Sequence, residues 1–420
     1  MSKRKQFTQI ITGLDIGSTA VRIAVGQLVA SQNGSRQNLQ IIGTAEVASE
    51  GIQKGSITSI EEAVSTISHV LEEIEHTVGQ PVERVWVGVS GSQILSQESR
   101  GVVAVAKTDG EISEEDMIRV VEAAQTVAAP LNYEVLHVLP RSFTVDGQTG
   151  VKDPVGMTGL RLEVDAQIIF GATPYVKNIT KAVYRTGVDI DDLVLSMLAT
   201  AEVILHSRQK ELGVMVVDIG GSTTTLLVFE GGNILHSAVI PIGSNHITND
   251  LALGLQTSID VAERVKTTVG DCIADEIHKK DIINLIDFGG EDEVVPKKFI
   301  AEIINARVVE IMHRINKELD KIQRRALLPS GAIFTGGGAK LRGIIDCAKI
   351  ELRMNVAYGF PSGIESATEK INDLSFTTAI GLVEWGVSVL QKTGSRTPRR
   401  FAPAGKMVES ARKIFQFLIP

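Results

Sequence analysis

The sequence predicts an α/β protein with two βαβ-like halves, each of which contains a turn suited to hold phosphate. Two turns of the same kind carry this prediction: Asp15-Ile16-Gly17-Ser18-Thr19 and Asp218-Ile219-Gly220-Gly221-Ser222-Thr223. Each turn lies between two β-rich apolar runs, residues 10–14 and 20–28 in the first case and 214–217 and 224–229 in the second, so each predicts a tight hairpin. A third, glycine-rich turn, Thr335-Gly336-Gly337-Gly338-Ala339, follows the apolar run 331–334.

The composition of these turns suits them to hold phosphate. Glycine lets successive backbone N–H groups converge on one place, serine and threonine add hydroxyl donors, and an anchored aspartate holds a cation through water. A single turn of this kind is common in ordinary hairpins. Two copies in separate halves of the chain, followed by the glycine-rich turn, are difficult to explain by chance.

Composition limits the class of protein. The 420 residues exceed what one hydrophobic core supports, so two or more domains or subdomains are expected. Cys272 and Cys347 lack metal-ligand spacing, and two isolated thiols favour core positions in a reducing cytoplasm. No run approaches the roughly 20 apolar residues that span a bilayer, and the first residues lead into a strand. The chain is therefore predicted to be neither exported nor integral to the membrane.

Charge is distributed unevenly along the chain. The net charge is −8, but the last thirty residues carry +6 and leave −14 on the rest. This asymmetry indicates that the last thirty residues form a functionally separate segment. No nucleic-acid partner is predicted.

The first half of the chain contains an insertion. Helical periodicity runs from Gly51 to Gly79, and a strand follows at residues 82–89. Short β runs then flank one helix that begins at Ser113-Glu114-Glu115-Asp116 and extends to about Ala129; they lie at residues 101–107, 133–140 and 160–170. This change of character predicts an inserted α+β subdomain.

The second half is expected to alternate strands and helices. Helical and loop segments at residues 175–187 and 191–211 lead into the second hairpin, and a returning strand ends at Gly243. Helices are predicted at 248–254, 259–269 and 297–326, before the strand at 331–334. Residues 391–406 are polar, basic and rich in Pro and Gly, which predicts a flexible linker.

The order of the three turns resembles the actin, Hsp70 and sugar-kinase superfamily across residues 8–390. The resemblance implies ATP bound between two doubly wound halves. Gly17, Ser18 and Thr19 would meet the outer phosphates, and Gly220, Gly221, Ser222 and Thr223 would enclose them from the other half. Asp15 and Asp218 would hold hydrated Mg²⁺.

The same resemblance assigns the nucleoside contacts. Gly336, Gly337 and Gly338 would let the backbone lie against the nucleoside, with the next helix offering its N-terminus to phosphate. Glu263 and Lys266 stand one turn apart on a predicted helix, where they would contact ribose and adenine. Spacing alone also permits a solvated salt bridge between these two residues.

Hydrolysis is expected to be slow. Related ATPases place an acid or Gln before the second hairpin to orient the attacking water, and here Ser196 occupies the comparable position. Serine has no charge with which to polarise water at neutral pH. Glu202 is the nearest substitute and a poor one, so the nucleotide is predicted to act as a structural switch.

Several longer motifs resemble the FtsA branch, the bacterial cell-division actin homologues. They are Gly51-Ile52-Gln53-Lys54-Gly55-Ser56-Ile57, Val87-Gly88-Val89-Ser90-Gly91, and the segments at residues 137–148 and 153–163. The resemblance implies a polymerising, ATP-binding adaptor that tethers FtsZ filaments to the cytoplasmic face of the inner membrane. It also implies self-association and recruitment of later divisome proteins through residues 86–168. The FtsZ C-terminal tail would bind at Lys297, Lys298 and Arg307, for which a solvated helix face is an equal alternative.

The FtsA resemblance also implies a division into subdomains. Subdomain 1A is expected at residues 8–85, 169–198 and 365–390, and the insert, 1C, at 86–168. Subdomain 2A is expected at 199–245 and 326–364, and 2B at 246–325. The linker, 391–406, and a membrane-targeting helix, 407–420, complete the prediction.

The last fourteen residues predict an amphipathic helix. From Met407 onward one sector is apolar except for Ser410 and contains Val408, Ala411, Ile414, Phe415, Phe417, Leu418 and Ile419. Arg412 and Lys413 lie on the polar side. Such a helix reaches only about 20 Å, too short to cross a core of about 30 Å, so it is expected in the interface of an anionic bilayer. The alternative is a helix docked on the protein itself.

Two other functions of the same fold stay open. A pilus-assembly ATP-binding protein related to FtsA should lack the amphipathic tail. A sugar or acetate kinase would need a catalytic carboxylate facing the γ-phosphate, and no candidate acid appears beyond the phosphate turns.

Overall fold

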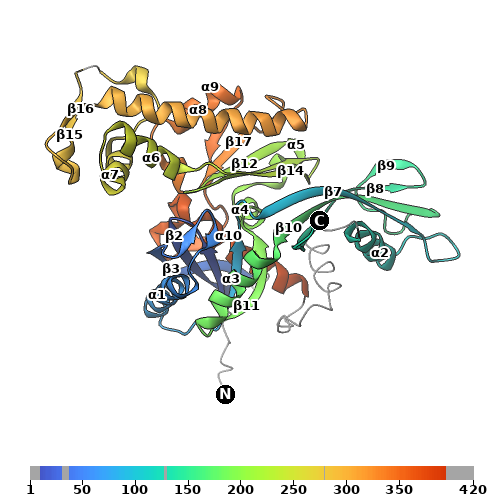
Figure 1. Cartoon of the computed structure of the whole chain (residues 1–420). Helices are drawn as coiled ribbons and strands as arrows, with labels where there is room; N and C mark the ends of the chain where they lie inside the picture. The colour runs from blue at the N-terminus through green and yellow to red at the C-terminus, as the bar shows by residue number, and fades with distance from the viewer. Residues whose placement is uncertain (1–9, 31–36, 127–129, 279, 394–420) are drawn as a thin grey trace.

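The computed structural model describes residues 10–30, 37–126, 130–278 and 280–393. Two sheets stand one above the other, and a third projects to one side (Figure 1). The lower sheet has the strand order β11-β6-β1-β2-β3-β19. β1 (Ile10–Ile16) pairs antiparallel with β2 (Ala20–Ala30) and parallel with β6 (Arg84–Val89). Its other strands are β3 (Gln37–Ala48), β11 (Asp189–Leu195) and β19 (Glu365–Ser366).

Helices pack closely on both faces of the lower sheet because glycines leave room for them. A Cβ on Gly13 or Gly26 would collide with α10 (Thr377–Thr393), at 2.3 Å from the Ala379 carbonyl oxygen in the first case. A Cβ on Gly43 would lie 2.6 Å from Val78 of α1 (Ile60–Val78), on the opposite face. α3 (Thr173–Arg185) packs beside α1, and α4 (Ser196–Ile204) beside α10.

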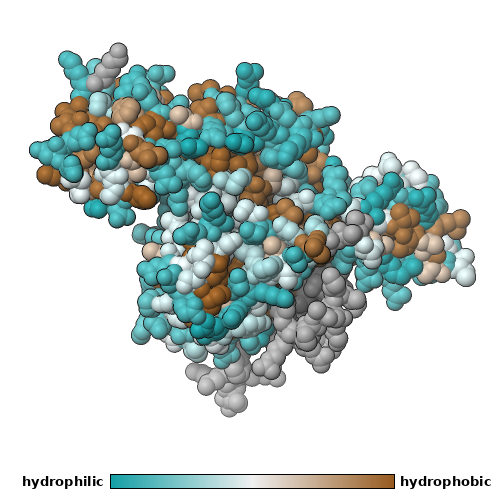
Figure 2. Space-filling model, viewed as in Figure 1, coloured by the Kyte–Doolittle hydropathy of each residue, from teal (hydrophilic) through white to brown (hydrophobic). Residues whose placement is uncertain are grey.

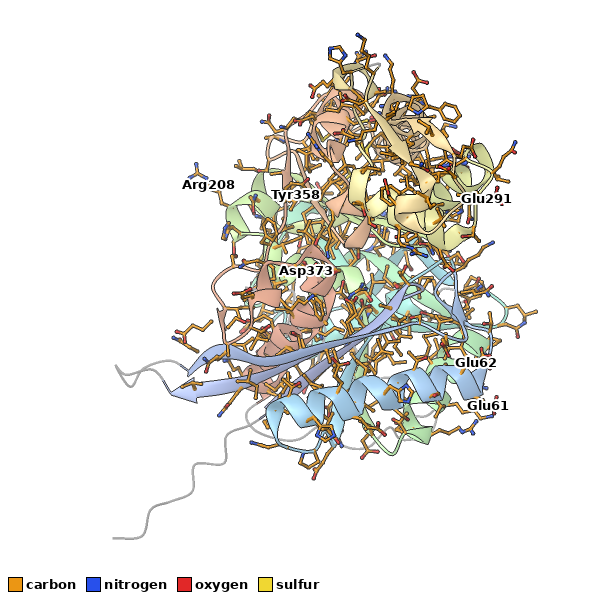
Figure 3. All side chains as sticks on the ribbon, turned by 90° about the vertical axis from the view of Figure 1, so that its left-hand side faces the viewer. Glu61, Glu62, Arg208, Glu291, Tyr358 and Asp373 are labelled. Atoms are coloured by element: carbon orange, nitrogen blue, oxygen red, sulfur yellow. The ribbon has the colours of Figure 1, made fainter. Side chains whose placement is uncertain are left out.

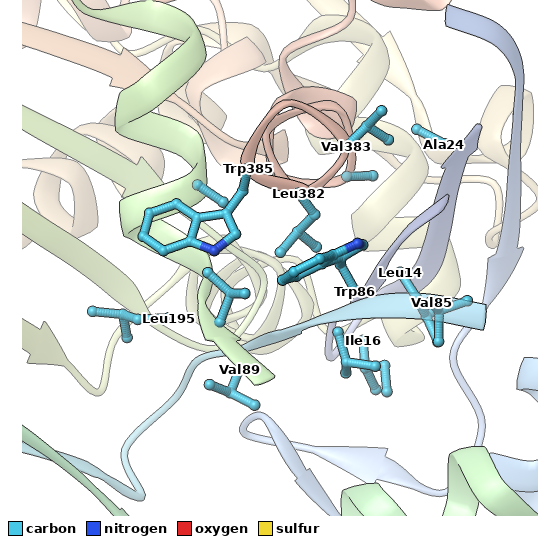
Figure 4. Close-up of a cluster of buried hydrophobic side chains, with 14 of the residues drawn as sticks. Leu14, Ile16, Ala24, Val85, Trp86, Val89, Leu195, Leu382, Val383 and Trp385 are labelled. Atoms are coloured by element: carbon cyan, nitrogen blue, oxygen red, sulfur yellow. The ribbon is translucent and has the colours of Figure 1, made fainter. Parts of the chain in front are cut away.

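Trp86 lies at the centre of this core. Its side chain is buried among Leu14, Leu382 and Val383, close to Trp385 (Figure 4). α10 approaches the indole so closely that a Cβ on Gly386 would lie 2.6 Å from its Nε1 atom. Truncating a buried aromatic of this kind costs about 3–5 kcal/mol.

The upper sheet repeats the arrangement of the lower one. β12 (Val214–Ile219) pairs antiparallel with β13 (Thr224–Glu230) and parallel with β17 (Ala332–Thr335), as β1 does with β2 and β6. The prediction of two related halves, each with a hairpin at the start of its sheet, is confirmed. The remaining strands are β14 (Asn233–Ile240) and β18 (Val356–Tyr358), at the two edges.

The helices of the upper half surround a second core, which includes both buried cysteines. They are α5 (Ser207–Leu212), α6 (Ser244–Gly254), α7 (Ile259–Val269), α8 (Lys297–Lys321) and α9 (Ile344–Leu352), with a small sheet of β15 (Ile282–Asn284) and β16 (Val294–Pro296) at the far end (Figure 1). α8 ends before the predicted residue 326. Gln323 and Ala326 adopt positive φ angles of 56° and 54°, which a continuing helix does not allow.

The insert forms the projecting sheet, with the order β7-β10-β8-β9 and only antiparallel pairs. α2 (Glu114–Gln125) covers one face and begins with a capping box between Ser113 and Asp116. The predicted start of the insert at residue 86 falls inside β6, which continues in the lower sheet to Val89. The strands are β7 (Ile94–Ala104), β8 (Tyr133–Val145), β9 (Gln148–Val151) and β10 (Arg161–Ala172).

Local assignments differ from the sequence predictions in two places. β11, at residues 189–195, overlaps the predicted helical and loop segment 191–211. Its acidic residues hide the alternating pattern of a strand. One of them pairs with a neighbouring strand: Asp191 Oδ1 lies 2.5 Å from the Arg84 Nε atom. A hairpin of β4 (Ile52–Gln53) and β5 (Ser56–Ile57) precedes α1, which begins nine residues later than Gly51. Short 3-10 turns occupy Ala274–Glu276, Leu285–Phe288, Gly337–Lys340, Glu369–Asn372 and Leu374–Phe376.

Two predictions concern the membrane. None of the helices within the described ranges has the length and apolar character needed to cross a bilayer. The predicted amphipathic helix, residues 407–420, and all but the first three residues of the predicted linker lie outside the described residues.

Candidate functional site

A cleft of about 610 Å³ lies between the two halves and is lined by both hairpins and the third glycine-rich turn. Asp373, which lines it, is labelled where the upper and lower halves meet (Figure 3). The structure brings together all fourteen residues predicted to bind the nucleotide: Asp15, Gly17, Ser18, Thr19, Asp218, Gly220, Gly221, Ser222, Thr223, Glu263, Lys266, Gly336, Gly337 and Gly338.

The two hairpins approach each other directly. A Cβ on Gly221 would lie only 2.1 Å from Thr19 Oγ1, so the missing side chain lets the turns meet. The second turn is held from behind by the first residues of α6, because the N–H groups of Ser244 and Asn245 donate to the carbonyl oxygens of Gly220 and Gly221 at 2.9 and 2.8 Å. The two turns therefore approach each other closely across the cleft.

Asp15 and Asp218 occupy equivalent positions, one near the end of β1 and the other near the end of β12. Burial raises the pKa of Asp15 to about 6, while Arg22 opposes the shift. Burial raises the pKa of Asp218 to about 7, the Asp15 charge adds to the shift, and Arg22 again opposes it. Two buried carboxylates that repel each other fit a hydrated divalent cation, which would relieve both penalties.

Gly336 is required next to Asp218 for two reasons. Its φ of +86° is one that side chains rarely adopt, and a Cβ there would lie 2.0 Å from Asp218 Oδ1. The glycines continue into a 3-10 turn, and α9 begins only at Ile344. The predicted helix N-terminus therefore does not directly follow the glycine-rich turn.

Hydrogen bonds fix the first hairpin to its own half. The Gly55 N–H donates to Ser18 Oγ at 2.7 Å, and the Ser49 hydroxyl donates to the Gly17 carbonyl oxygen at 2.6 Å. The Ser18 hydroxyl therefore joins the phosphate turn to the β4–β5 loop.

Glu263 and Lys266 pair with each other, and the pair is buried at the lysine and 44% exposed at the glutamate. Lys266 is only 7% exposed, and its Nζ atom lies 2.6 Å from Glu263 Oε2 and 2.8 Å from Thr248 Oγ1. Both residues line the cleft. A buried ammonium group held in this way presents a fixed positive charge to a ligand.

Ser196, predicted to stand in place of a water-orienting acid, lines the cleft. It begins α4 and is 4% exposed, and its hydroxyl has no hydrogen-bond partner among the described residues. Gly88 makes room for it, since a Cβ on Gly88 would lie 2.8 Å from Ser196 Oγ and 3.5 Å from Asp15 Oδ1. Glu202 faces elsewhere: it accepts a hydrogen bond from Lys210 Nζ at 2.8 Å and does not line the cleft.

Comparisons with known proteins identify the family. The family model "Cell division protein FtsA" matches residues 215–381, and "SHS2 domain inserted in FTSA" matches residues 91–170. Cell division protein FtsA of Bacillus subtilis (strain 168) is 36% identical over 90% of this chain and 83% of its own length. The chain belongs to the FtsA family. FtsA of Pseudomonas aeruginosa is 34% identical, over 91% of this chain and 90% of its own length, and FtsA of Escherichia coli K12 is 30% identical, over 90% of each.

Solved structures place this FtsA-family chain in the actin-like ATPase fold. A PilM–PilN type IV pilus biogenesis complex matches 90% of this chain and 98% of that chain, with a TM-score of 0.66 and 17% identity. MreB5 of Spiroplasma citri, bound to ADP, matches 92% and 99%, with a TM-score of 0.54 and 12% identity. At these identities the likeness concerns the fold alone.

Four basic residues of the cleft were not predicted: Arg22, Lys340, Arg342 and Lys370. The Arg22 Nε atom lies 2.7 Å from Glu46 Oε2, and the guanidinium carbon lies 5.9 Å from the centre of the Phe376 ring. One signal was present in the sequence, because Arg22 is the only charged residue in the apolar run 20–28. Lys340, which pairs with Asp373, directly follows the glycine-rich turn.

The residues predicted to receive the FtsZ tail differ in their surroundings. Arg307 is held within its own half, with Nε 2.7 Å and Nη2 3.0 Å from the Asp250 carboxylate, and it also pairs with Glu310. Lys297 and Lys298 form the first turn of α8, and Lys298 Nζ lies 3.8 Å from a fully exposed Asp275 carboxylate. Lys298 and Arg307 are about equally exposed, at 28% and 25%, and differ in that the partners of Arg307 belong to the folded core of its half.

Proposed function

We propose that this chain is an ATP-binding, filament-forming cell-division adaptor that tethers FtsZ filaments to the cytoplasmic face of the inner membrane and recruits later divisome proteins. The observation that carries the proposal is the meeting of the two phosphate hairpins across a cleft whose wall offers Ser196 where a hydrolytic acid would stand. Such a site binds nucleotide as a clamp and turns it over slowly.

The residues present fit ATP and Mg²⁺. The two turns supply backbone N–H groups and hydroxyls for the phosphates, and Asp15 and Asp218 supply the charge that a hydrated Mg²⁺ needs. Lys266 and Glu263 provide one donor and one acceptor for the nucleoside. Bound Mg²⁺ would neutralise phosphate charge, and the chain's own contribution is to hold the two halves closed around it.

The upper half offers a surface for an FtsZ tail. Exposed apolar side chains gather at the end of the molecule that carries β15 and β16 (Figure 2), where Ile282, Val294 and Phe299 are exposed. Lys297 and Lys298 lie beside them in sequence. Apolar side chains next to cations suit a short peptide of mixed apolar and acidic character.

The membrane role rests on the amphipathic pattern of residues 407–420, which lie outside the described residues. An apolar sector with flanking cations predicts interfacial binding to anionic lipid. The insert, whose sheet extends from residue 94 to residue 172, would provide the surface for self-association and for later division proteins.

Binding of a fluorescent FtsZ C-terminal peptide tests the adaptor function. We expect Lys297→Glu with Lys298→Glu to abolish binding, because the charge that attracts an acidic peptide is reversed. The matched control is Lys177→Glu with Lys181→Glu, two exposed lysines on one face of α3, which should bind like the unaltered chain. If the unaltered chain does not bind the peptide at all, the tethering function is wrong.

A pilus-assembly ATP-binding protein of the same fold is the second candidate. It predicts no binding to anionic vesicles. Phe415→Asp should abolish vesicle pelleting if the tail is an anchor, whereas Gln416→Asp adds the same charge on the polar face and should not. Equal pelleting of the two variants would reject the anchor. A small-molecule kinase is less favoured, since Ser196 stands in place of an acid.

A further inference from the structure

Tyr175 connects the insert to the wall of the cleft. It lies in the first turn of α3, directly after β10, the last strand of the insert, and it is buried. Its hydroxyl donates to the Ser90 carbonyl oxygen at 2.7 Å and accepts from the Ser90 N–H at 3.2 Å. Ser90 lines the cleft and directly follows β6. One side chain thus binds both backbone groups of a cleft residue.

The same segment touches the phosphate hairpin through the β4–β5 loop. The Gly55 N–H donates to Ser18 Oγ, and the Gly55 backbone lies so close to Ser90 that a Cβ would come within 3.2 Å of the Ser90 carbonyl oxygen. Ser18, Gly55, Ser90 and Tyr175 therefore form one continuous row of contacts. This row joins the phosphate turn to the first turn of α3.

His137 makes a second connection, from β8 of the insert. Its Nε2 atom accepts a hydrogen bond from the Leu195 N–H at 2.9 Å, in the buried interior. Leu195 is the last residue of β11, and Ser196, whose unpartnered hydroxyl lies in the cleft wall, comes next. Among the described residues the His137 Nδ1 atom has no partner, so a single hydrogen bond joins this ring to the wall.

The two connections reach strands that are joined to each other. The Ala172 N–H donates to the Gln93 carbonyl oxygen at 3.0 Å, and the Thr173 N–H donates to the Asn132 carbonyl oxygen at 2.8 Å. β8 and β10 are paired along almost their full lengths. The base of the insert therefore moves as a unit when either connection is displaced.

From this geometry we infer that Tyr175 and His137 are positioning residues that couple nucleotide occupancy of the cleft to the position of the insert. The inference deepens the proposed function and rests on it, because it supplies the route by which ATP changes the surface for self-association and later partners. The element that would be coupled is the base of the insert, which both the cleft and a partner bound to the insert would bias. By linkage, a partner that binds the insert must change ATP affinity by the same factor.

Hydrogen–deuterium exchange of the full chain, with and without a non-hydrolysable ATP analogue and Mg²⁺, tests the inference. In the unaltered protein we expect the ligand to change exchange in peptides covering β8 to β10. Tyr175→Phe should reduce this change at least threefold while ATP affinity stays within threefold, because only the hydroxyl is removed. The matched control, Tyr184→Phe on the same helix at a 39% exposed position, should keep the full change.

Variants at the second connection keep the test decisive should Tyr175→Phe fail to fold. His137→Leu removes the acceptor and should lose the change, and His137→Gln supplies a side-chain oxygen to Leu195 and should restore it. The inference is overturned if the variants respond like the unaltered chain, if they lose ATP binding more than threefold, or if the unaltered chain binds ATP without any change in the insert. Absence of ATP binding in the unaltered chain would instead overturn the proposed function.

Discussion

Replacing Gly221 with alanine should force the two phosphate hairpins apart. The added Cβ would lie 2.1 Å from Thr19 Oγ1 and 3.1 Å from Asn245 Oδ1, whereas ordinary contact begins at 3.4 Å. Either the exposed Thr19 side chain rotates about χ1 or the turns separate by about 1 Å, and overpacking that separates them costs about 1–3 kcal/mol. Since each 1.4 kcal/mol is tenfold in affinity, ATP should bind roughly 5- to 150-fold more weakly.

Isothermal titration calorimetry with Mg²⁺ and ATP measures this effect. Gly220→Ala is the comparison within the same turn: its Cβ would meet only the Thr223 carbonyl oxygen, at 3.1 Å, within its own hairpin, so it should weaken ATP binding less than Gly221→Ala does. Thr19→Ala removes the colliding hydroxyl, so in the double variant Thr19→Ala, Gly221→Ala the loss should be smaller than the sum of the two single losses. If Gly221→Ala binds ATP within twofold of the unaltered chain, contact between the two phosphate hairpins does not control ATP binding.

Three further predictions concern the cleft and the core. Ser196→Glu should raise phosphate release from ATP by about tenfold or more, because it supplies the missing carboxylate; an unchanged rate would reject this position as the water-orienting one. The pKa values of Asp15, about 6, and Asp218, about 7, mean that Mg²⁺ must displace protons. Mg²⁺-dependent ATP binding should therefore strengthen as pH rises through this range, and Asp218→Asn should flatten the dependence measured by titration. Burial lowers the pKa of His137 to about 4, so its contribution to stability is complete above its unfolded value of 6.5 and is lost as pH falls towards 4. In urea unfolding, His137→Gln should lessen this loss, by at most about 3 kcal/mol, and an unchanged pH slope would contradict it.

The parts of the site that are local in sequence were predictable. Asp15 and Asp218 each stand at a strand end, followed by glycine and hydroxyl residues, and this pattern alone specifies a hairpin that exposes N–H groups. The glycine at 336 was predictable for the same reason, although its contact with Asp218 was not. Local rules were sufficient here because the turn and its chemistry use the same few residues.

Features that depend on distant segments were not predictable from spacing. Arg22 acts on Asp218 only because the two halves close on each other, and Tyr175 meets Ser90 only because the insert leaves and re-enters the lower sheet at one place. The strand β11 was not predicted because its acidic residues look like a solvent-exposed segment in the sequence. In the structure Asp189 and Asp191 pair with Arg84 of the adjacent strand. The ion pair of Arg307 with Asp250 of a neighbouring helix was not predictable either, and its role in peptide binding stays a prediction.

Recruitment of FtsZ to lipid vesicles tests the central claim most directly. Purified FtsZ filaments, anionic vesicles and this chain would be pelleted together, with and without Mg²⁺ and ATP. The adaptor predicts that FtsZ pellets with the vesicles only when the intact chain and nucleotide are present, and that Phe415→Asp abolishes recruitment while Gln416→Asp preserves it. Recruitment that is independent of the chain, of ATP or of the tail would contradict the proposal of a nucleotide-gated membrane adaptor.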